Sequence, residues 1–209
     1  MMTRRLVLLG MIVAMAMQRR PAAAGAGADQ VAGARSFMNW LADQAIAVLR
    51  RTSASLEQRE AAFRQLLLQA FDIAFIGRFV LGRYWRQMTA AEREDYLGVF
   101  SDFLVKTYSR RLGGYSGESF AITGAKPTGK KDIVVGTNIR RPSGPPIRAD
   151  WRLRVIDRRY RIIDVSVEGI SMALTQRTEF ASVVQNHGVP GLLQALRIRT
   201  QGYGAKNTG

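Results

Sequence analysis

The stretch IRADWRLRVIDRRYRIIDVSVE, residues 147–168, decides the fold of this 209-residue chain. Its first half alternates apolar and charged side chains, which is the pattern of a strand with one buried and one solvated face. The apolar positions are Trp151, Leu153 and Val155. The second half, residues 160–168, is rich in β-branched side chains. The pair Arg158-Arg159 lies between the halves, so the stretch predicts a tight antiparallel hairpin.

Two further strands are predicted upstream of this hairpin. Residues 119–124 and 132–140 are rich in β-branched residues and are bounded by glycine, proline and charged side chains. Residues 141–146 contain both proline and glycine, which indicates a loop long enough to join neighbouring antiparallel strands. The four predicted strands therefore form a meander, in which each strand lies beside the next one along the chain.

Helices are predicted on both sides of this segment in the sequence. Apolar side chains recur at spacings of three and four residues over 31–51 and again over 55–71, which is the period of amphipathic helices. Two shorter helices are expected to close the chain, at 173–186 and 190–197. The polar residues that follow, 200–209, are expected to form a disordered tail.

Capping residues mark the ends of two more helices. Asp72 is placed to cap a short helix that ends at Gly82, although a ligand-binding role for this carboxylate stays open. Thr89 followed by Glu92 is a capping box. The box opens a long helix that reaches Tyr108 and carries aromatic side chains on one side.

The order of elements predicts an α+β fold, a four-stranded antiparallel sheet with helices packed on one face. No internal repeat or linker divides residues 29–199, so they are expected to form one domain. With 47% apolar residues, a chain of this length can build a substantial core. Such a fold can also enclose an apolar cavity, if the facing side chains do not fill the space between the layers.

Residues 1–28 have the three-part layout of a secretory signal. Two arginines precede an apolar run at 6–17, and 22–28 is nearly all alanine and glycine. The run of about 12 residues is shorter than the roughly 20 that a membrane-spanning helix needs. We therefore expect export by the general or the twin-arginine route, with cleavage near Ala24 or Ala28. Retention as an uncleaved anchor is the alternative.

Charge and cysteine content exclude some functions. The chain has no cysteine, so disulfides, thiolate metal sites and cysteine nucleophiles are ruled out. Its net charge of +15 favours acidic partners, either anionic lipid head groups or nucleic acid. Nucleic acid is disfavoured, because the basic residues are scattered in doublets instead of alternating with aromatic residues along one stripe. The export signal argues in the same direction.

Three stretches of the chain resemble the MlaC family of periplasmic lipid-binding proteins, also called toluene-tolerance proteins. They are FD at 71–72 with RFVLGRYWR at 78–86, IDV at 163–165 with EGIS at 168–171, and QR at 176–177 with Phe180. The resemblance implies a pocket that takes phospholipid acyl chains and leaves the head group outside. It also implies a periplasmic location and shuttling between an outer-membrane lipoprotein complex and an inner-membrane ABC transporter complex, in the maintenance of lipid asymmetry.

The identity of the cargo stays open between phospholipid and hopanoid. The segments RYWR, 83–86, and SMALTQR, 171–177, are also similar to the hopanoid-associated HpnM branch of the family. That branch shares the fold that the resemblance implies. Lipid is in either case the cargo, and no other cofactor is expected.

Enclosure of the acyl chains is the physical reason to expect a cavity. Two chains contain roughly 30 methylenes, each worth about 0.8 kcal/mol of transfer from water, which no surface patch offsets. The candidate walls are Phe75, Phe79, Phe100, Phe103, Leu104, Trp151, Leu153, Val155, Ile163, Val165 and Val167. The candidates for the cavity mouth are the amphipathic residues Tyr84, Trp85, Tyr108 and Tyr115. An ordinary core explains each of these side chains as well.

Five charged residues of the motifs have two interpretations each. Arg83 and Arg86 flank an aromatic pair and are candidates for binding a phosphate head group, since guanidinium groups are charge-assisted donors. A solvated turn explains them equally well. Asp164, Glu168 and Arg177 are interpreted as an internal ion-paired group that fixes the chain after the last strand, with head-group contact as the alternative.

Two other classes of function are weighed against a lipid carrier. An enzyme is disfavoured, because the one histidine, His187, lies at a predicted helix end. No Gly-x-Ser-x-Gly elbow, zinc-spaced histidine pair or Walker loop occurs in the sequence. A basic adaptor that docks on membranes or proteins without an interior ligand is the other alternative. A monomer is expected of a carrier that docks at two places.

Overall fold

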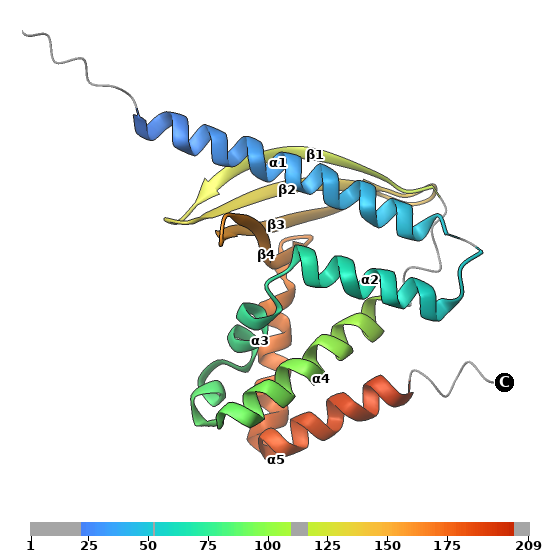
Figure 1. Cartoon of the computed structure of the whole chain (residues 1–209), viewed down its shortest axis with the longest axis vertical. Helices are drawn as coiled ribbons and strands as arrows, with labels where there is room; N and C mark the ends of the chain where they lie inside the picture. The colour runs from blue at the N-terminus through green and yellow to red at the C-terminus, as the bar shows by residue number, and fades with distance from the viewer. Residues whose placement is uncertain (1–21, 52, 110–116, 203–209) are drawn as a thin grey trace, which may run out of the picture.

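The computed structural model describes residues 22–51, 53–109 and 117–202. In its upper part, helix α1 lies along the sheet, and in its lower part helices α3, α4 and α5 pack together, with α2 between the two parts (Figure 1). The elements in chain order are α1 Ala22–Leu49, α2 Leu56–Ala70, α3 Ile73–Leu81, the 3-10 helix η1 Gly82–Gln87, α4 Ala90–Ser109, β1 Ser119–Thr128, β2 Asp132–Arg140, β3 Ile147–Ile156, β4 Arg159–Val167, β5 Ile170–Ser171 and α5 Met172–Gly202.

The sheet is an antiparallel meander in the order β1-β2-β3-β4-β5. The hairpin predicted from residues 147–168 is confirmed as β3 and β4, and Ile156 pairs with Arg159. Its turn lies at Asp157 and Arg158, whose φ angles are 49° and 61°. Two consecutive residues with positive φ form the turn that matches the right-handed twist of a hairpin.

The sheet has five strands, where the sequence predicted four. After β4, Glu168 and Gly169 take positive φ angles of 49° and 82°, and the chain reverses. β5 is the two-residue segment Ile170–Ser171, which then pairs with the end of β4. Two residues are too few to carry an alternating pattern, so this strand has no signal in the sequence.

A β-bulge interrupts the pairing of β3 with β4. Arg152 pairs with Asp164 and Leu153 with Ile162, so Ile163 is the extra residue on β4. The side chains of β4 that face the covering helices are therefore three residues apart across the bulge instead of two.

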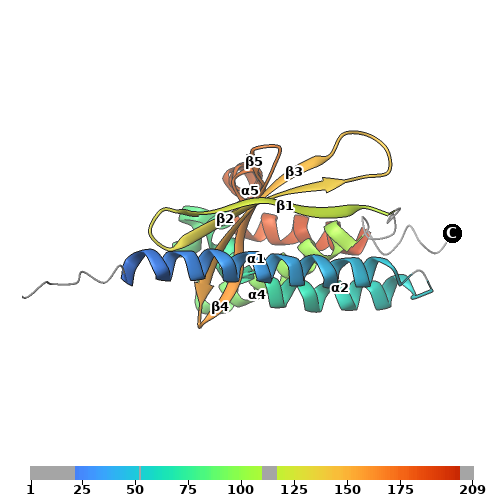
Figure 2. The same ribbon diagram turned by 90° about the horizontal axis from the view of Figure 1, so that it is seen from above.

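Helices α1 and α2 cover one face of the sheet, as predicted, and form the upper core with it (Figure 2). The Tyr160 hydroxyl of β4 donates a hydrogen bond of 2.9 Å to the Gln30 carbonyl of α1. At Gly33 a Cβ atom would lie only 2.4 Å from that hydroxyl oxygen, so only glycine fits at this crossing. The buried members of the upper core are Ala34, Met38, Leu41, Leu66, Ala70, Ile133, Val135, Leu153 and Ile162.

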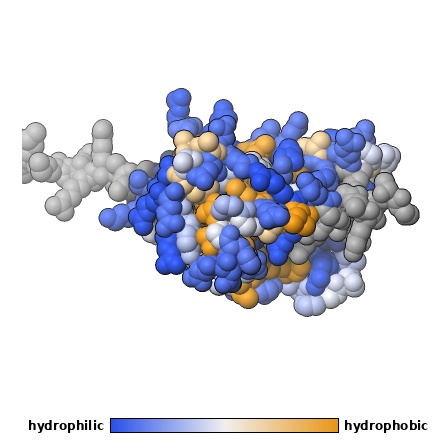
Figure 3. Space-filling model, turned by 90° about the horizontal axis from the view of Figure 1, so that it is seen from below, coloured by the Kyte–Doolittle hydropathy of each residue, from blue (hydrophilic) through white to orange (hydrophobic). Residues whose placement is uncertain are grey.

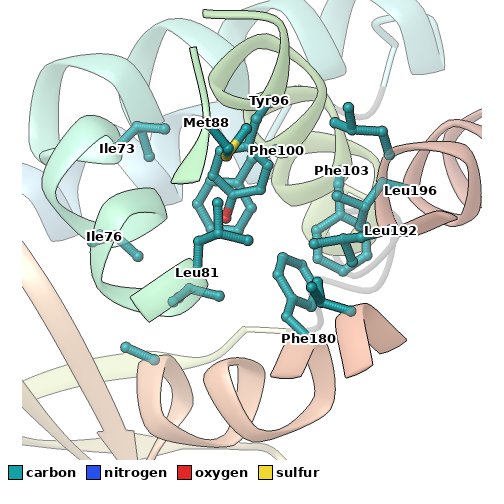
Figure 4. Close-up of a cluster of buried hydrophobic side chains, with 14 of the residues drawn as sticks. Ile73, Ile76, Leu81, Met88, Tyr96, Phe100, Phe103, Phe180, Leu192 and Leu196 are labelled. Carbon is teal, nitrogen blue, oxygen red and sulfur yellow. The ribbon is translucent and has the colours of Figure 1, made fainter. Parts of the chain in front are cut away.

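Helices α3, α4 and α5 form the lower core (Figure 4). The buried Tyr96 hydroxyl donates a hydrogen bond of 3.0 Å to the Gly77 carbonyl, which satisfies it. Gly77 also lets α4 approach α3 closely, since a Cβ atom there would lie 2.8 Å from the Leu97 side chain. The buried members of the lower core are Leu67, Ile73, Ile76, Val80, Leu81, Met88, Tyr96, Phe100, Phe103, Val105, Ala173, Phe180, Val184, Leu192, Leu193 and Leu196.

The predicted helix caps are confirmed. The Asp72 carboxylate accepts a hydrogen bond of 2.9 Å from the Phe75 N–H at the start of α3. Before α4, the Glu92 carboxylate accepts from the Thr89 N–H at 2.7 Å, and the Thr89 hydroxyl accepts from the Glu92 N–H at 3.2 Å. These bonds satisfy backbone donors that the helices themselves leave free.

Helix α1 starts earlier than predicted, at Ala22 instead of residue 31. Alanine favours a helix by intrinsic propensity, without the apolar stripe on which the prediction relied. Residues 22–28, the end of the predicted signal, are therefore helical. Residues 1–21 lie outside the described residues, so the signal stays a prediction.

Helix α5 spans both of the predicted closing helices. It bends at Gly188, whose φ of 69° and ψ of 179° are not helical, and Pro190 follows the bend. The helix ends at Gly202, which corrects the prediction of a disordered tail from residue 200. Thr200 belongs to this last turn, where its hydroxyl donates to the Arg197 carbonyl at 2.8 Å. Residues 203–209 lie outside the described part.

The opposite face of the sheet carries charged side chains. Asp132 is only 5% exposed and accepts hydrogen bonds of 2.6 and 2.8 Å from Arg152 and of 2.7 and 3.1 Å from Arg154. Burial alone would raise the pKa of the Asp132 carboxyl, but the bonds from the two guanidinium groups outweigh burial and hold the pKa below its usual value. Helix α3 reaches this face, where Arg154 lies 4.9 Å from the centre of the Phe75 ring.

Asp132→Asn is expected to lower the free energy of unfolding by about 1–3 kcal/mol near neutral pH. Because the folded pKa of Asp132 is depressed, its contribution is present above the unfolded pKa of about 3.9 and is lost as the pH falls through the folded pKa. Urea unfolding of both proteins should therefore give a difference in stability that narrows in acid. A difference that stays constant from neutral pH into acid would contradict this role.

Candidate functional site

The helix-borne wall candidates lie together in the lower core. Phe100 and Phe103 of α4 are 1% and 4% exposed, and each contacts Phe180 of α5 with ring centroids 6.1 Å apart. The half-buried candidates packed against this core are Phe75, Phe79 and Leu104. The structure therefore brings this group together, with Phe100 and Phe103 packed as core residues.

The sheet-borne candidates lie elsewhere. Leu153 is fully buried in the upper core, and Trp151 and Val165 are half-buried against it. Ile163 is 3% exposed at the bulge, and Val167 is half-buried near the end of β4. The helix-borne candidates thus belong to the lower core, and Leu153, Trp151 and Val165 to the upper core, while Ile163 and Val167 are members of neither.

Val155, also predicted as a wall, is 41% exposed and belongs to neither core, so its role stays a prediction. Val155 pairs with Tyr160, close to the turn of the β3–β4 hairpin. The tip of this hairpin protrudes beyond α1 (Figure 2). Alternation along a strand indicates the direction of a side chain, but not how far the covering helices extend.

The two cores meet at Phe71, between α2 and α3. Phe71 is half-buried and packs against both cores. Its backbone forms an isolated parallel bridge with Ile162 of β4, and the next N–H, that of Asp72, donates to the Ile162 carbonyl at 3.0 Å. We call the contact between the two cores at Phe71 the seam.

A groove of about 510 Å³ opens beside the seam. Its size falls within the range of about 300–1,000 Å³ that is typical of small-molecule sites. The lining comes from the end of α2, the start of α3 and the β3–β4 hairpin, and none of it was predicted as a wall. The lining residues are Leu68, Phe71, Asp72, Ile73, Ala74, Ile156, Asp157, Arg159 and Arg161.

Fixed charges frame the apolar part of the groove. The Arg161 guanidinium donates to the Leu68 carbonyl at 2.9 Å and to the Gln69 carbonyl, both in the last turn of α2. A cation is favourable there, because the carbonyl ends of the helix dipoles point toward it. On the other side, the Asp72 carboxylate is held at the start of α3. The lining thus combines apolar side chains with charged ones, which suits an amphipathic molecule.

Two of the predicted mouth residues, with the two head-group candidates, lie in η1 and not at the groove. Tyr84 and Trp85 are half-buried against the lower core. Arg83 donates a hydrogen bond of 2.9 Å to the Tyr84 hydroxyl, and Arg86 is exposed. The other two candidates are Tyr108, half-buried in the last turn of α4, and Tyr115, outside the described residues.

The predicted ion-paired group of Asp164, Glu168 and Arg177 is not formed. The Asp164 carboxylate accepts from the Ser171 hydroxyl at 2.7 Å, which ties β4 to β5. Glu168 accepts from a backbone N–H of β3 at 2.7 Å. The Arg177 guanidinium carbon lies instead over an aromatic ring of α3, 5.1 Å from its centre. Backbone and hydroxyl donors thus take the place of the expected ion pair.

The histidine, the possible metal ligands and the apolar helices bear on other classes of site. His187 is exposed on α5. Within the described ranges, no group of three or more His, Cys, Asp or Glu side chains is arranged to hold a metal ion. In those ranges, too, no helix combines the length and the apolar character needed to cross a bilayer.

Sequence reasoning missed the groove, although one signal pointed to it. Phe71 directly precedes the cap residue Asp72, at the break between two helical patterns. A large aromatic side chain at such a break has to be buried by elements outside its own helix. The pattern does not tell which elements these are.

Comparisons with known proteins agree on one family. A family model described as MlaC protein matches residues 40–198. The intermembrane phospholipid transport system binding protein MlaC of Haemophilus influenzae is 21% identical over 169 residues, which cover 77% of this chain and 79% of that protein. A phospholipid-binding protein from Ralstonia solanacearum, solved in complex with a phospholipid, matches with a TM-score of 0.73 at 20% identity, over 81% of this chain and 97% of that one. At this identity the structural likeness concerns the fold.

Proposed function

This chain belongs to the MlaC family, and from that premise we propose that it is a lipid carrier that encloses phospholipid acyl chains and shuttles lipid between membranes. The observation that carries the proposal is the seam, where two separate apolar cores meet at Phe71 beside an open groove. The phospholipid bound by the Ralstonia protein, which shares the fold, supports it. The name of the Haemophilus relative, a binding protein of an intermembrane phospholipid transport system, supports it as well.

The seam is a better place for acyl chains than the interior of either core. A core at crystal-like packing density has no room for a chain, whereas two cores that meet along one contact can part there. Acyl chains between them would cover the apolar surface that parting exposes. Phe71 and the half-buried side chains around it, not Phe100 or Leu153, would then line the cavity.

The head group stays at the rim of the groove in this proposal. Arg159 lies in the lining, and Arg161 is anchored to the end of α2. A guanidinium group is a charge-assisted donor to phosphate oxygens. Arg83 and Arg86, the candidates from sequence, lie around η1 instead.

A shuttle needs a compartment between two membranes and a docking partner at each. The signal-like sequence of residues 1–28 supports a periplasmic location. We propose an inner-membrane ABC transporter complex and an outer-membrane lipoprotein complex as partners, and a monomer as the working form. Carrying lipid requires no bond to be made or broken, so neither catalysis nor a cofactor enters the proposal.

Lipid extracted from the protein is the direct test. The protein is purified from a bacterial periplasm without detergent, and its organic-solvent extract is analysed by mass spectrometry. We expect close to one lipid per protein, and the spectrum will identify the cargo as phospholipid or hopanoid. A folded protein that is empty, and stays empty after incubation with lipid vesicles, would refute the carrier and favour a basic adaptor.

A further inference from the structure

The arginines around η1 have no carboxylate partners. We call Arg83, Arg86, Arg93 and Arg177 the arginine cluster. Among the described residues, none of the four forms an ion pair, whereas Arg197 on the same lower part bonds Asp95 at 2.6 Å. Of the two carboxylates beside Arg93 in the sequence, Glu94 is exposed, and Glu92 is held by Thr89, whose backbone and hydroxyl bonds lower the pKa of Glu92.

Aromatic rings and backbone carbonyls position the cluster in place of carboxylates. The distances from guanidinium carbon to ring centroid are 5.0 Å for Arg83 over Tyr84, 5.3 Å for Arg93 over Trp85 and 5.1 Å for Arg177 over Phe79. Arg93 also donates to the Trp85 carbonyl at 3.1 Å. Stacking of this kind orders a guanidinium group without neutralising it, so its charge stays available to an outside anion.

Two of the four arginines belong to η1, and the other two contact it from α4 and α5. Arg83 and Arg86 are part of η1, which has six residues. Arg177 of α5 lies against its first residue, with guanidinium atoms 3.1–3.2 Å from the place of a Cβ atom at Gly82. Arg93 of α4 donates a hydrogen bond to the carbonyl of Trp85, which lies in the middle of η1.

Two exposed aliphatic side chains precede Arg177 in the chain, and one of them, Leu174, shares a helix face with it. Ile170 is 61% and Leu174 is 55% exposed. Leu174 precedes Arg177 by three residues on α5, which places both on the same helix face. On the side of the molecule seen from below, apolar residues are likewise bordered by hydrophilic ones (Figure 3).

From this arrangement we propose that the arginine cluster, with Leu174, docks the protein on the phosphate layer of an anionic bilayer. Arginine charge attracts such a surface, half-buried tyrosine and tryptophan suit its interface, and exposed aliphatic groups insert below the phosphates. A free phosphate ion would use the charge alone and leave the aliphatic side chain in water. The proposal goes beyond lipid carriage, because it assigns a membrane-contacting surface apart from the groove.

Flotation with lipid vesicles tests the proposal. The purified protein is mixed with vesicles of phosphatidylcholine alone or with added phosphatidylglycerol, and the bound fraction is measured at rising salt. We expect binding only to the anionic vesicles, weakening with salt. Arg83→Gln/Arg86→Gln should lower the partition coefficient about 30-fold, at about fivefold for each arginine. Arg83→Lys/Arg86→Lys, which keeps the charge, should bind as the unchanged protein does.

The matched control is Arg35→Gln/Arg140→Gln, which removes two exposed arginines on α1 and β2. We expect it to bind like the unchanged protein. Equal losses in the two glutamine variants would overturn the proposal, because net charge and not the cluster would then explain binding. Equal binding to both kinds of vesicle, or displacement by inorganic phosphate at matched ionic strength, would overturn it as well.

Lipid extracted from the same variants separates this proposal from the carrier proposal. The cluster lies outside the groove, so lipid per protein should be unchanged in Arg83→Gln/Arg86→Gln. If the unchanged protein carries no lipid, the carrier proposal fails, while the vesicle result still decides the docking surface. If Arg83→Gln/Arg86→Gln does not fold, Arg86→Gln alone, at an exposed position, replaces it and should lower the partition coefficient about fivefold, whereas Arg140→Gln should not.

Discussion

Phe100→Ala is expected to lower the free energy of unfolding by about 3–5 kcal/mol, the usual range for truncating a buried aromatic side chain. Phe100 is 1% exposed in the lower core. Its ring stacks on Tyr96 with a centroid distance of 5.7 Å and meets Phe180 edge-on at 6.1 Å (Figure 4). These neighbours come from two helices and cannot collapse fully into the space left behind. Urea unfolding followed by far-ultraviolet circular dichroism measures the loss.

The matched control for this variant is Phe75→Ala, the same truncation at a half-buried position of the lower core. We expect a smaller loss of stability there, because less apolar surface is removed from burial. The pair also tests the interpretation of Phe100 as a cavity wall. Truncating a cavity wall would change the lipid content and cost little stability. We expect Phe100→Ala instead to leave the lipid content unchanged and to lower the free energy of unfolding strongly. A loss no greater than that of Phe75→Ala would contradict the packing described above.

Local rules account for most of the fold. The alternation of residues 147–168 places its side chains on two faces of a sheet, and a slip of one residue would turn the apolar set toward water. The caps at Asp72 and Thr89 were predictable because their hydrogen bonds reach only three residues along the chain. Strands and helix starts are thus specified by near neighbours in the sequence.

Features that depend on distant contacts escaped prediction. β5 is held by the Ser171 hydroxyl, which donates to Asp164 across a reversal of the chain, and by two pairings with β4. The bulge at Ile163 shifts the register of β4 without any glycine or proline to mark it. Neither feature has a periodic or compositional signal within its own segment.

The candidate site shows the same limit. Phe100 and Leu153 both follow an apolar pattern, yet they lie in different cores. Periodicity indicates which side of an element is buried but not which partner buries it. The separation of the cores arises at Phe71, where the chain pairs with β4 between two helices. Where the two cores meet is therefore decided by one residue at the end of a periodic segment, and its own pattern does not reveal its partners.

Ala74→Glu is the variant that tests the seam most directly, and we expect it to weaken lipid binding about tenfold, equivalent to about 1.4 kcal/mol. Ala74 is exposed on α3 and lines the groove. A carboxylate at position 74 either stays hydrated within the groove or forms an ion pair across the groove with Arg159 or Arg161. Both arrangements oppose the entry of acyl chains. Lipid per protein, measured by mass spectrometry after incubation with vesicles, reports the effect.

Ala91→Glu supplies the control, because it adds the same charge at an equivalent position. Ala74 and Ala91 are both exposed and both are the second residue of a helix, where an acidic side chain is favourable. Both variants should keep the stability of the unchanged protein within about 0.5 kcal/mol. If Ala91→Glu loses as much lipid as Ala74→Glu, added negative charge explains the loss. If neither loses lipid, acyl chains enter elsewhere and the two cores do not part at Phe71.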